Sequence, residues 1–346
     1  MAELELDTFT LFLSWKCNFT CSHCGFSCSP QRNEKMDIKS ARSYIEEAST
    51  NPNLKMVAYS GGEPFLFYEE LKELMSFSHH KGLRAGVVTN CFWSDSPSTA
   101  AGKLNELKEL GLDEVITSID DYHLEHVNIN NVKNLIEAAI SLRIRVGINI
   151  LMTLDSQIRK DNLHEFLNLP EHLLKNPENA WMRESSPIRV GRAKKHFEKS
   201  RLKQYGEIDL MGNPCHYVIR NTVVAPDGST YACCGFGGAS EHGPSSITFG
   251  GNINKRGFNA ILEGFKANLL LNIISSKGPY VLLKMAQETD PTLKIRTKFV
   301  SICDVCEEIS SNLQLRNILK KLLNELSASV SSTTASILEV QNDRIY

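Results

Sequence analysis

The feature that most constrains the fold is a regular alternation of short apolar runs with longer segments of helical periodicity in the first two thirds of the chain. Short apolar runs bounded by turn residues predict strands, and apolar residues spaced three or four apart predict amphipathic helices. Strands alternating with helices in this order predict parallel strands joined by right-handed crossovers. Six such units predict an α/β fold with an open, partial (β/α)6 barrel rather than a closed eightfold one. The strands are expected at 8–14, 54–60, 83–89, 114–119, 144–151 and 179–184, and the helices at 37–49, 68–80, 97–109, 130–141 and 158–168.

The alternation ends near residue 205, which divides the chain. A short hairpin is expected in "NTVVAPDGSTYACC", with its turn at Asp227-Gly228. Irregular and helical sequence follows, and residues 327–334 are rich in serine and threonine, which favours a loose linker. We therefore expect a barrel at 1–205, a small extension at 206–310 and a helical tail at 311–346.

Charge and hydropathy exclude two classes of partner. The net charge is only −2, with both signs dispersed, whereas nucleic-acid binding normally needs a concentrated basic surface. No apolar stretch approaches the roughly 20 residues of a membrane span, and the first residues lack the order of a signal peptide. We expect a cytoplasmic protein that acts on a small or peptidic substrate, without nucleic-acid or membrane partners.

Clustered cysteines indicate metal chemistry, because a reducing cytosol disfavours structural disulfides. The segment "WKCNFTCSHCGFSCSP" places Cys17, Cys21 and Cys24 on one loop after the first predicted strand. Three thiolates at this spacing suit one iron-sulfur cluster and leave one iron without a protein ligand. A zinc site is the alternative, although zinc knuckles favour two-residue gaps and a second ligand pair nearby. We expect Cys28, which follows closely, to pack beneath the loop, with contact to the substrate as the alternative.

A second set of cysteines lies in the last third of the chain. Cys215 precedes the predicted hairpin, the doublet Cys233-Cys234 follows it, and Cys303 and Cys306 come later with a two-residue gap. That gap suits two thiolates on one metal centre, and zinc would satisfy the same geometry as an iron-sulfur cluster. Adjacent residues of an extended strand point to opposite sides, so one cysteine of the doublet is expected to be a ligand and the other free.

Two motifs together resemble those of radical S-adenosylmethionine (SAM) enzymes. One is the C-x-x-x-C-x-x-C loop, and the other is "YSGGEPF", with Gly61, Gly62, Glu63 and Pro64 at the end of the second predicted strand. The resemblance implies that the open iron binds the amino and carboxylate groups of SAM, and that reduction of the cluster yields a 5'-deoxyadenosyl radical. It also implies that this segment meets the SAM amino group, where glycines expose carbonyls and Glu63 adds a negative charge.

Other polar residues match the same family less specifically. They lie at or near the ends of predicted strands, where the family offers groups to the SAM ribose and carboxylate, and strand-end capping would explain them equally well. In "SPIRVGRA", which resembles a segment after the sixth strand in many of these enzymes, Arg192 could bind the SAM carboxylate or make a surface ion pair. The strand-end residues are Thr89, Asn90, Ser118, Asp120 and Asn149.

The last third resembles the SPASM or twitch extensions of peptide-modifying radical SAM enzymes. The resemblance is carried by "CHYVIRNTVVAPDGSTYACC" and "FGGNINKRGFNAIL". It favours an auxiliary cluster over zinc, so that the cofactors implied are SAM and two 4Fe-4S clusters. The implied ligands of the second cluster are Cys215, Cys233, Cys303 and Cys306.

A narrower resemblance covers most of residues 10 to 310 and points to the radical SAM peptide epimerase of the epipeptide pathway. It is carried by "CNFTCSHCGFSCSP", "YSGGEPFLFYEELKEL", "TNCFWS", "DDYH", "APDGSTYACC", "LLLNIISSKG" and "SICDVC". It implies that L-residues of a ribosomally made precursor peptide become D-residues: the adenosyl radical removes a Cα hydrogen and a cysteine thiol returns one from the opposite face. Cys234 is the implied donor, and Cys91, which stands where glycine is usual after Thr-Asn, is the reserve. An external electron donor of the flavodoxin or ferredoxin type is also implied.

Two other function classes stay open from the sequence. One is another radical modification, such as thioether or carbon-carbon crosslinking, dehydrogenation, or epimerisation of an antibiotic sugar. It would use the same metal set without a catalytic role for Cys234. The other is a zinc-bound or non-catalytic scaffold, which would contain little iron and cleave no SAM.

Overall fold

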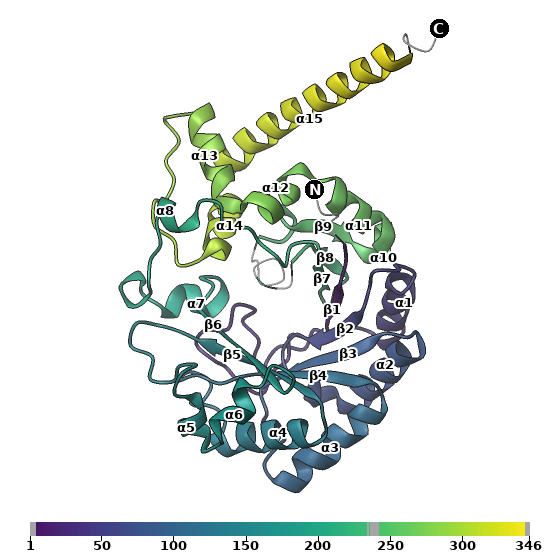
Figure 1. The fold of residues 1–346 in the computed structure, drawn as a ribbon, viewed down its shortest axis with the longest axis vertical. Helices are drawn as coiled ribbons and strands as arrows, with labels where there is room; N and C mark the ends of the chain where they lie inside the picture. The colour runs from purple at the N-terminus through teal and green to yellow at the C-terminus, as the bar shows by residue number, and fades with distance from the viewer. Residues whose placement is uncertain (1–4, 234, 236–241, 343–346) are drawn as a thin grey trace.

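The computed structural model describes residues 5–233, 235 and 242–342 of the chain. Within them one sheet has the strand order β6-β5-β4-β3-β2-β1-β7-β8-β9, and β1 to β6 are parallel (Figure 1). The sheet is not closed, which confirms the partial barrel. The six parallel strands are β1 (Thr8–Phe12), β2 (Met56–Ser60), β3 (Arg84–Thr89), β4 (Leu112–Ser118), β5 (Arg145–Leu151) and β6 (Ala180–Ser185).

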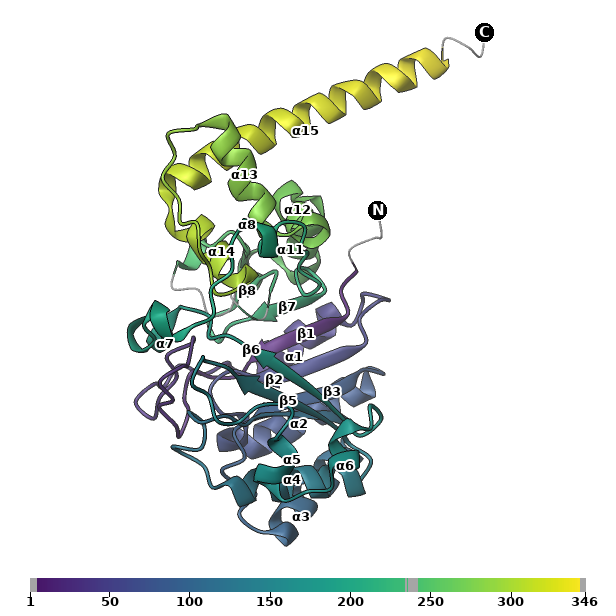
Figure 2. The same cartoon turned by 60° about the vertical axis from the view of Figure 1, so that its left-hand side comes forward.

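Helices connect these strands and cover the outer face of the sheet (Figures 1 and 2). Four of the five predicted helices agree with the structure within one residue at each end. The fifth, expected at 158–168, is a shorter helix followed by another, because Asn168 adopts a left-handed conformation and Pro170 comes just after it. The helices are α1 (Ile38–Ala48), α2 (Tyr68–His80), α3 (Pro97–Glu109), α4 (Ile129–Ser141), α5 (Leu163–Leu167) and α6 (Glu171–Lys175), with a 3-10 helix, η1 (Pro64–Phe67), before α2.

The two faces of the parallel sheet differ in burial. Outward residues of β2 such as Val57 and Tyr59 are fully buried, and the Tyr59 hydroxyl donates a hydrogen bond to the Leu74 carbonyl oxygen on α2. The alternate, inward residues Met56 and Ala58 stay partly exposed. Since β4 and β5 repeat much of this alternation, inward residues of β2, β4 and β5 are partly exposed while outward residues carry the core.

The predicted hairpin is confirmed, but it continues the barrel sheet. The strands β7 (Asn221–Val224) and β8 (Ser229–Tyr231) are antiparallel, and Gly228 at their turn has a φ of +84°. Because β7 pairs in parallel with β1, there is no break in the sheet near residue 205. The sheet ends at β9 (Phe249–Asn252), which pairs with β8.

Helices make up most of the remaining chain. The last helix runs without interruption and projects from the molecule, so the loose linker expected at 327–334 is wrong (Figures 1 and 2). Serine and threonine lower helix propensity only modestly, so they do not end it. None of the helices in the described part of the chain is long and apolar enough to cross a membrane. These helices are α7 (Gly191–His196), η2 (Lys199–Arg201), α8 (Glu207–Leu210), η3 (Gly243–Ser245), α10 (Ile253–Arg256), α11 (Phe258–Ala267), α12 (Leu269–Lys277), α13 (Pro279–Thr289), α14 (Ile302–Ser311) and α15 (Leu313–Asn342).

Candidate functional site

The cysteine loop and the Gly-Gly-Glu-Pro segment lie side by side at the carboxyl ends of β1 and β2. The chain after β1 continues alongside the chain after β2 through backbone hydrogen bonds. The Gly62 N–H donates to the Ser14 carbonyl oxygen at 2.6 Å, and the Glu63 N–H donates to the Lys16 carbonyl oxygen at 2.9 Å. Because Lys16 directly precedes Cys17, these bonds bring the second motif next to the first cysteine.

Close backbone approach explains both glycines of that motif. A Cβ atom on Gly62 would lie 1.8 Å from the Lys16 carbonyl oxygen, and one on Gly61 would lie 2.5 Å from that of Ser14. Gly61 also has a φ of +123°, which side chains rarely allow. The family resemblance accounts for these glycines by their carbonyls, and the packing of the two segments is an independent reason for them.

Cys17, Cys21 and Cys24 form one group of thiols, of which Cys21 is buried and the other two are partly exposed. Burial raises the pKa of Cys17 to about 11 and that of Cys21 to about 12. The charges of Glu63 and Cys24 add to the increase at Cys17, and those of Cys24 and Cys17 add to the increase at Cys21. The Phe19 N–H and the Asn90 side-chain amide both point toward the Cys17 Sγ atom, at 3.4 and 3.7 Å. Three thiolates so close together would repel one another without a cation, so this donor set fits an iron-sulfur cluster.

Cys28 packs beneath the loop, as expected. It is buried, and its thiol lies 3.8 Å from the Gly61 carbonyl oxygen, to which it donates. A hydrogen bond with the Cys28 thiol lowers the pKa of Cys24 to about 6, and the same bond, together with burial, raises the pKa of Cys28. Cys28 therefore links a predicted cluster ligand to the glycine motif.

The segment after β6 also reaches the cysteine loop. Arg192 donates from its backbone N–H to the Cys24 carbonyl oxygen at 3.1 Å, and from Nε to the Cys21 carbonyl oxygen at 2.9 Å. A Cβ atom on Gly191 would lie 2.3 Å from the Gly25 carbonyl oxygen, and its φ is +55°. Arg192 therefore uses these donors to hold the cysteine loop, from the opposite edge of the barrel, rather than in a surface ion pair.

Glu63 is buried and accepts three hydrogen bonds from the protein. Its donors are the Phe65 N–H at 3.0 Å, the Thr89 hydroxyl at 2.9 Å and the Asn90 N–H at 2.7 Å. Burial raises the pKa of Glu63 to about 7. A carboxylate has about four acceptor positions, so one is left for a further donor. Pro64 follows at the start of η1, which Glu63 caps.

The residues at the end of β3 divide between the two sides of the sheet. Thr89 is buried behind the strand against Glu63, whereas the Asn90 side-chain amide donates to Asn18 Oδ1, in the cysteine loop, at 2.9 Å. Cys91 has a φ of +63°, which explains why glycine is usual at this position. Its thiol is fully buried 2.8 Å from the Thr117 hydroxyl, and burial raises the pKa of Cys91 to about 12.

Asp120 uses its carboxylate to hold the loop after β4. It accepts from the backbone N–H groups of Tyr122, His123 and Leu151 and from His123 Nδ1 at 2.8 Å. Burial alone would raise the pKa of Asp120, but the charge and hydrogen bonds of His123 outweigh it and lower the pKa to about 2. These four bonds fill its acceptor positions, so the structure favours the capping role over a SAM contact.

Two histidines lie against the cysteine loop. The rings of His23 and His123 are 4.3 Å apart, and burial and His123 lower the pKa of His23 to about 3, which keeps it neutral. The Nδ1 atom of His23 is buried with no hydrogen-bond partner among the described residues. The Cys21 thiol and one nitrogen of each ring lie within 4.8 Å of one another, which would also suit a single metal ion.

Two further polar residues on the concave face lie side by side. Ser118 on β4 pairs in register with Asn149 on β5, and both are partly exposed. The sequence analysis missed Arg183 of β6, which donates to Asn149 Oδ1 at 3.1 Å and to the Tyr217 hydroxyl at 3.0 Å. The sequence feature that could have identified Arg183 is a charged residue in the sixth predicted strand, at a position that faces inward. Tyr217 joins this row to the segment that contains Cys215.

The second cysteine set also converges. Cys303 and Cys306 lie three residues apart on α14 and so share a face of the helix. Burial raises the pKa of Cys306 well above its usual value, and the charges of Cys303, Cys215 and Cys233 raise it further. The four thiols therefore lie within electrostatic reach of one another and suit one metal cluster. Cys234 lies outside the described residues.

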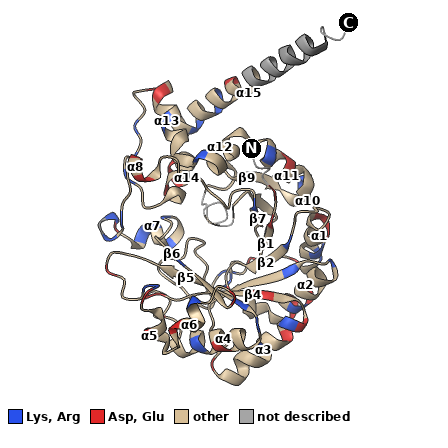
Figure 3. Ribbon diagram, viewed as in Figure 1, with Lys and Arg blue, Asp and Glu red and all other residues tan. Residues whose placement is uncertain are grey.

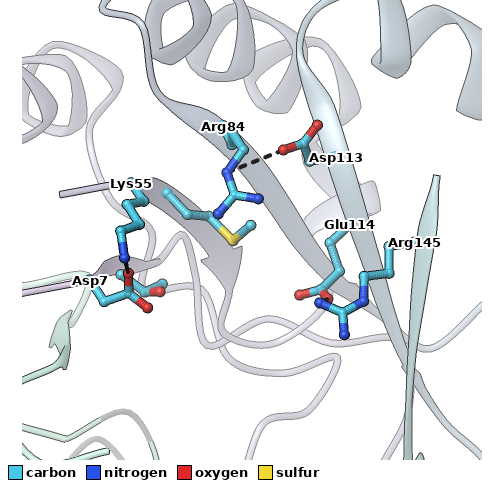
Figure 4. A pocket seen from close by; sticks show the side chains of 8 residues that line it. Asp7, Lys55, Arg84, Asp113, Glu114 and Arg145 are labelled. Atoms are coloured by element: carbon cyan, nitrogen blue, oxygen red, sulfur yellow. Dashed lines mark ion pairs between the residues drawn. The ribbon is translucent and has the colours of Figure 1, made fainter. Parts of the chain in front are cut away.

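The structure also has a charged pocket of about 390 Å³ at the opposite, amino-terminal end of the strands (Figure 4). Its charged side chains pair with one another, at 3.1 Å for Lys55 with Asp7, 3.4 Å for Arg84 with Asp113 and 3.9 Å for Arg145 with Glu114. Charges of both signs are also interspersed on the helices around the barrel (Figure 3). We assign this pocket no part in the candidate site. Its lining residues are Asp7, Thr8, Lys55, Met56, Arg84, Asp113, Glu114 and Arg145.

The chain is similar to several known proteins. Residues 13–167 match the radical SAM superfamily. The chain is similar to YydG of Bacillus subtilis (strain 168), named as a peptide biosynthesis protein, with 25% identity over 324 residues that cover 92% of this chain and 98% of the relative. A shorter similarity, 26% over 126 residues, covers 36% of this chain and 30% of the Fe-coproporphyrin III synthase of Methanosarcina barkeri (strain Fusaro / DSM 804). The crystal structure of Streptococcus suis SuiB bound to precursor peptide SuiA matches 88% of this chain and 76% of that chain, at 14% identity and a TM-score of 0.49.

Proposed function

We propose that this radical SAM enzyme converts L-residues of a ribosomally made precursor peptide into D-residues. The observation that carries the peptide substrate is the similarity to a peptide biosynthesis protein along nearly the full length of both chains. When bound, SAM and its 4Fe-4S cluster supply a 5'-deoxyadenosyl radical, which takes the Cα hydrogen. The partly exposed inward residues of β2 and β4 support a substrate that enters from the carboxyl ends of the strands.

In this proposal the cysteine loop holds the first cluster and the neighbouring strand ends hold SAM. Cys17, Cys21 and Cys24 would be the ligands, and the remaining acceptor position of Glu63 and the carbonyls of Gly61 and Gly62 would meet the SAM ammonium. We give a supporting role to the residues that hold the cysteine loop, the Glu63 segment or the loop after β4 in place. The proposed SAM contacts further along the sheet are Asn90, Ser118 and Asn149, and the supporting residues are Pro64, Thr89, Asp120 and Arg192.

The auxiliary 4Fe-4S cluster would be held by the converging thiols of the last third. The grouping of Cys215, Cys233, Cys303 and Cys306 supports it, and zinc remains the competing metal because it accepts the same four ligands. Iron and sulfide analysis of anaerobically purified protein separates the two. An external electron donor of the flavodoxin or ferredoxin type would supply the reducing electrons.

Hydrogen return is assigned to Cys234. It directly follows the proposed ligand Cys233 in the sequence, and the two are expected to point to opposite sides of an extended chain. In the reaction the Cα–H bond would break and its hydrogen atom would pass to the 5'-deoxyadenosyl radical, giving 5'-deoxyadenosine, after which the S–H hydrogen atom of Cys234 would form the new Cα–H bond. The thiyl radical left on sulfur regains an electron from the external donor and a proton from solvent. The full burial of Cys91 argues against the reserve donor.

The test uses the reconstituted enzyme in heavy water with the peptide encoded by the short reading frame nearest its gene. A thiol proton exchanges with solvent, so each inverted Cα should gain one deuterium. Cys234→Ala should still form 5'-deoxyadenosine but little D-residue, because the substrate radical receives no hydrogen. Cys233→Ala is the matched control and should instead lose auxiliary-cluster iron.

Two outcomes would contradict this proposal at different points. Deuterated D-product from Cys234→Ala at the wild-type rate would remove Cys234 as donor and leave epimerisation standing. A crosslinked or dehydrogenated product from the wild type, without solvent deuterium, would replace epimerisation by another radical modification.

A further inference from the structure

The two edge strands of the sheet, β9 and β6, differ in whether other segments cover them. At one end, α10 and α11 pack against β9, and a Cβ atom on Gly250 would lie 2.4 Å from the Phe265 ring of α11. The Gly250 carbonyl oxygen also accepts from the Arg256 side chain at 3.2 Å. At the other end, β6 pairs only with β5 among the strands of the described residues. Proteins usually cover or disrupt such edges, because unpaired main-chain groups invite another strand.

The hydrogen-bond pattern identifies the main-chain groups on the open edge of β6. The Val146 N–H donates to the Asn179 carbonyl oxygen, and the Met152 N–H donates to the Ser185 carbonyl oxygen. The main-chain N–H and C=O groups of the odd-numbered residues of β6 therefore point toward β5. In a parallel pair the alternate residues direct their N–H and C=O groups the other way. These residues are Met182 and Glu184, whose main-chain groups have no partner among the residues that the structure describes.

The open edge is exposed and leads to the candidate site. Arg183, Glu184 and Ser185 are all exposed. The Lys160 N–H donates to Glu184 Oε1 at 2.7 Å, so a described loop contacts that side chain but not the outward main-chain groups of this half of β6. Only five residues separate the end of this strand from Gly191, which packs against the cysteine loop at Gly25. A strand added beside β6 would therefore run along the side of the barrel that ends at the predicted cluster.

We infer that an extended segment of the peptide substrate adds to the sheet beside β6. This inference rests on the proposed function for the identity of the partner. Main-chain bonds to Met182 and Glu184 would hold the peptide largely independently of its sequence, as in other cases of strand addition. The inward side chain of Arg183, which bonds to Asn149 and Tyr217, would lie beside alternate residues of the peptide.

The experiment compares Met182→Pro with Met182→Ala in the cluster-loaded enzyme with SAM. Proline removes the outward N–H group and blocks the edge, and an edge strand tolerates it because that N–H faces solvent. Alanine removes the side chain and keeps the N–H. Binding of the fluorescein-labelled peptide encoded by the neighbouring reading frame should weaken about tenfold or more in the proline variant and less than about twofold in the alanine variant. Iron content and melting temperature check that both variants fold.

A second measurement needs no variant. Residue-resolved hydrogen exchange of the wild type should show slower exchange at the Met182 and Glu184 amides when the peptide is added, because both would become hydrogen-bonded. Equal binding by the proline variant, or unchanged exchange at both amides while the peptide is bound and epimerised, would overturn strand addition but not the proposed function. A wild type that does not bind the peptide would overturn both.

Discussion

Among single residues, Glu63 connects burial to cofactor binding. Its pKa of about 7 means that near neutral pH only part of the enzyme carries the carboxylate that would meet the SAM ammonium. Binding of the cation favours the ionised form, so the wild-type affinity for SAM should improve as the pH rises from about 6 to 8. Glu63→Gln should lack this component, need more SAM for half-maximal cleavage, and keep the wild-type iron spectrum. Initial rates of 5'-deoxyadenosine formation against SAM concentration at several pH values measure this, and loss of iron in the variant would show a structural role instead.

Gly62 provides a second test at this scale. In Gly62→Ala the new Cβ would overlap the Lys16 carbonyl oxygen, so the two segments must separate, at a cost of about 1–3 kcal/mol in the free energy of unfolding. Gly102 in α3 is the matched control, because a Cβ there meets nothing within 4 Å. Gly102→Ala should be neutral or stabilising by up to about 1 kcal/mol. Denaturant unfolding measures both variants, and equal stability of the two would reject the close-approach explanation.

At the scale of elements, the position of α14 decides whether its two cysteines can share a metal. Arg296 bonds to both carboxylate oxygens of Asp304 at 3.0 and 3.1 Å, and its guanidinium lies 4.8 Å from the centre of the Phe299 ring. Asp304 is buried and lies between Cys303 and Cys306. This ion pair therefore fixes the helix that carries two of the proposed ligands.

Replacing Arg296 tests whether this ion pair is needed for the cysteines of α14 to bind the auxiliary cluster. Arg296→Met leaves the buried Asp304 carboxylate without its cation, and we expect a loss of about 3 kcal/mol in the free energy of unfolding and less auxiliary-cluster iron. Arg42→Met is the control, since Arg42 also pairs with a glutamate at 2.9 Å and lies over a phenylalanine, but in an exposed position, where at most about 1 kcal/mol is expected. Iron analysis and denaturant unfolding report the result, and full iron content in the Arg296 variant would contradict it.

At the scale of the whole molecule, the two cysteine groups should be separable. Replacing Cys17, Cys21 and Cys24 by alanine should abolish SAM cleavage and leave about half of the iron, since the two clusters are of equal size. Replacing Cys215 and Cys306 should remove the other half and leave SAM cleavage measurable without peptide. Iron, sulfide and 5'-deoxyadenosine are the measured quantities. SAM cleavage that survives in the first variant would refute the assignment of the cysteine loop.

Local sequence patterns account for most of the barrel. The elements from β1 to α4 were predictable because each is determined by apolar periodicity and by the turn and capping residues of its own segment, as with Asp37 before α1. The tail was predicted to be helical, but its continuity through residues 327–334 was not, because serine and threonine there were weighed as linker residues although they permit a helix. The pairing of β7 with β1 could not be predicted either, because strands so far apart in the chain carry no local record of each other.

The same division holds for the candidate site. The sequence by itself determined which residue types are available, namely the spacing of Cys17, Cys21 and Cys24, the Gly-Gly-Glu-Pro motif and the second cysteine set, because short spacings constrain geometry directly. Only the tertiary structure decided where they lie. Packing brings Cys215 and Cys233 to α14 and turns Asp120 toward His123. These outcomes depend on contacts between segments distant in the chain, where burial and hydrogen-bond satisfaction across the whole fold select one arrangement.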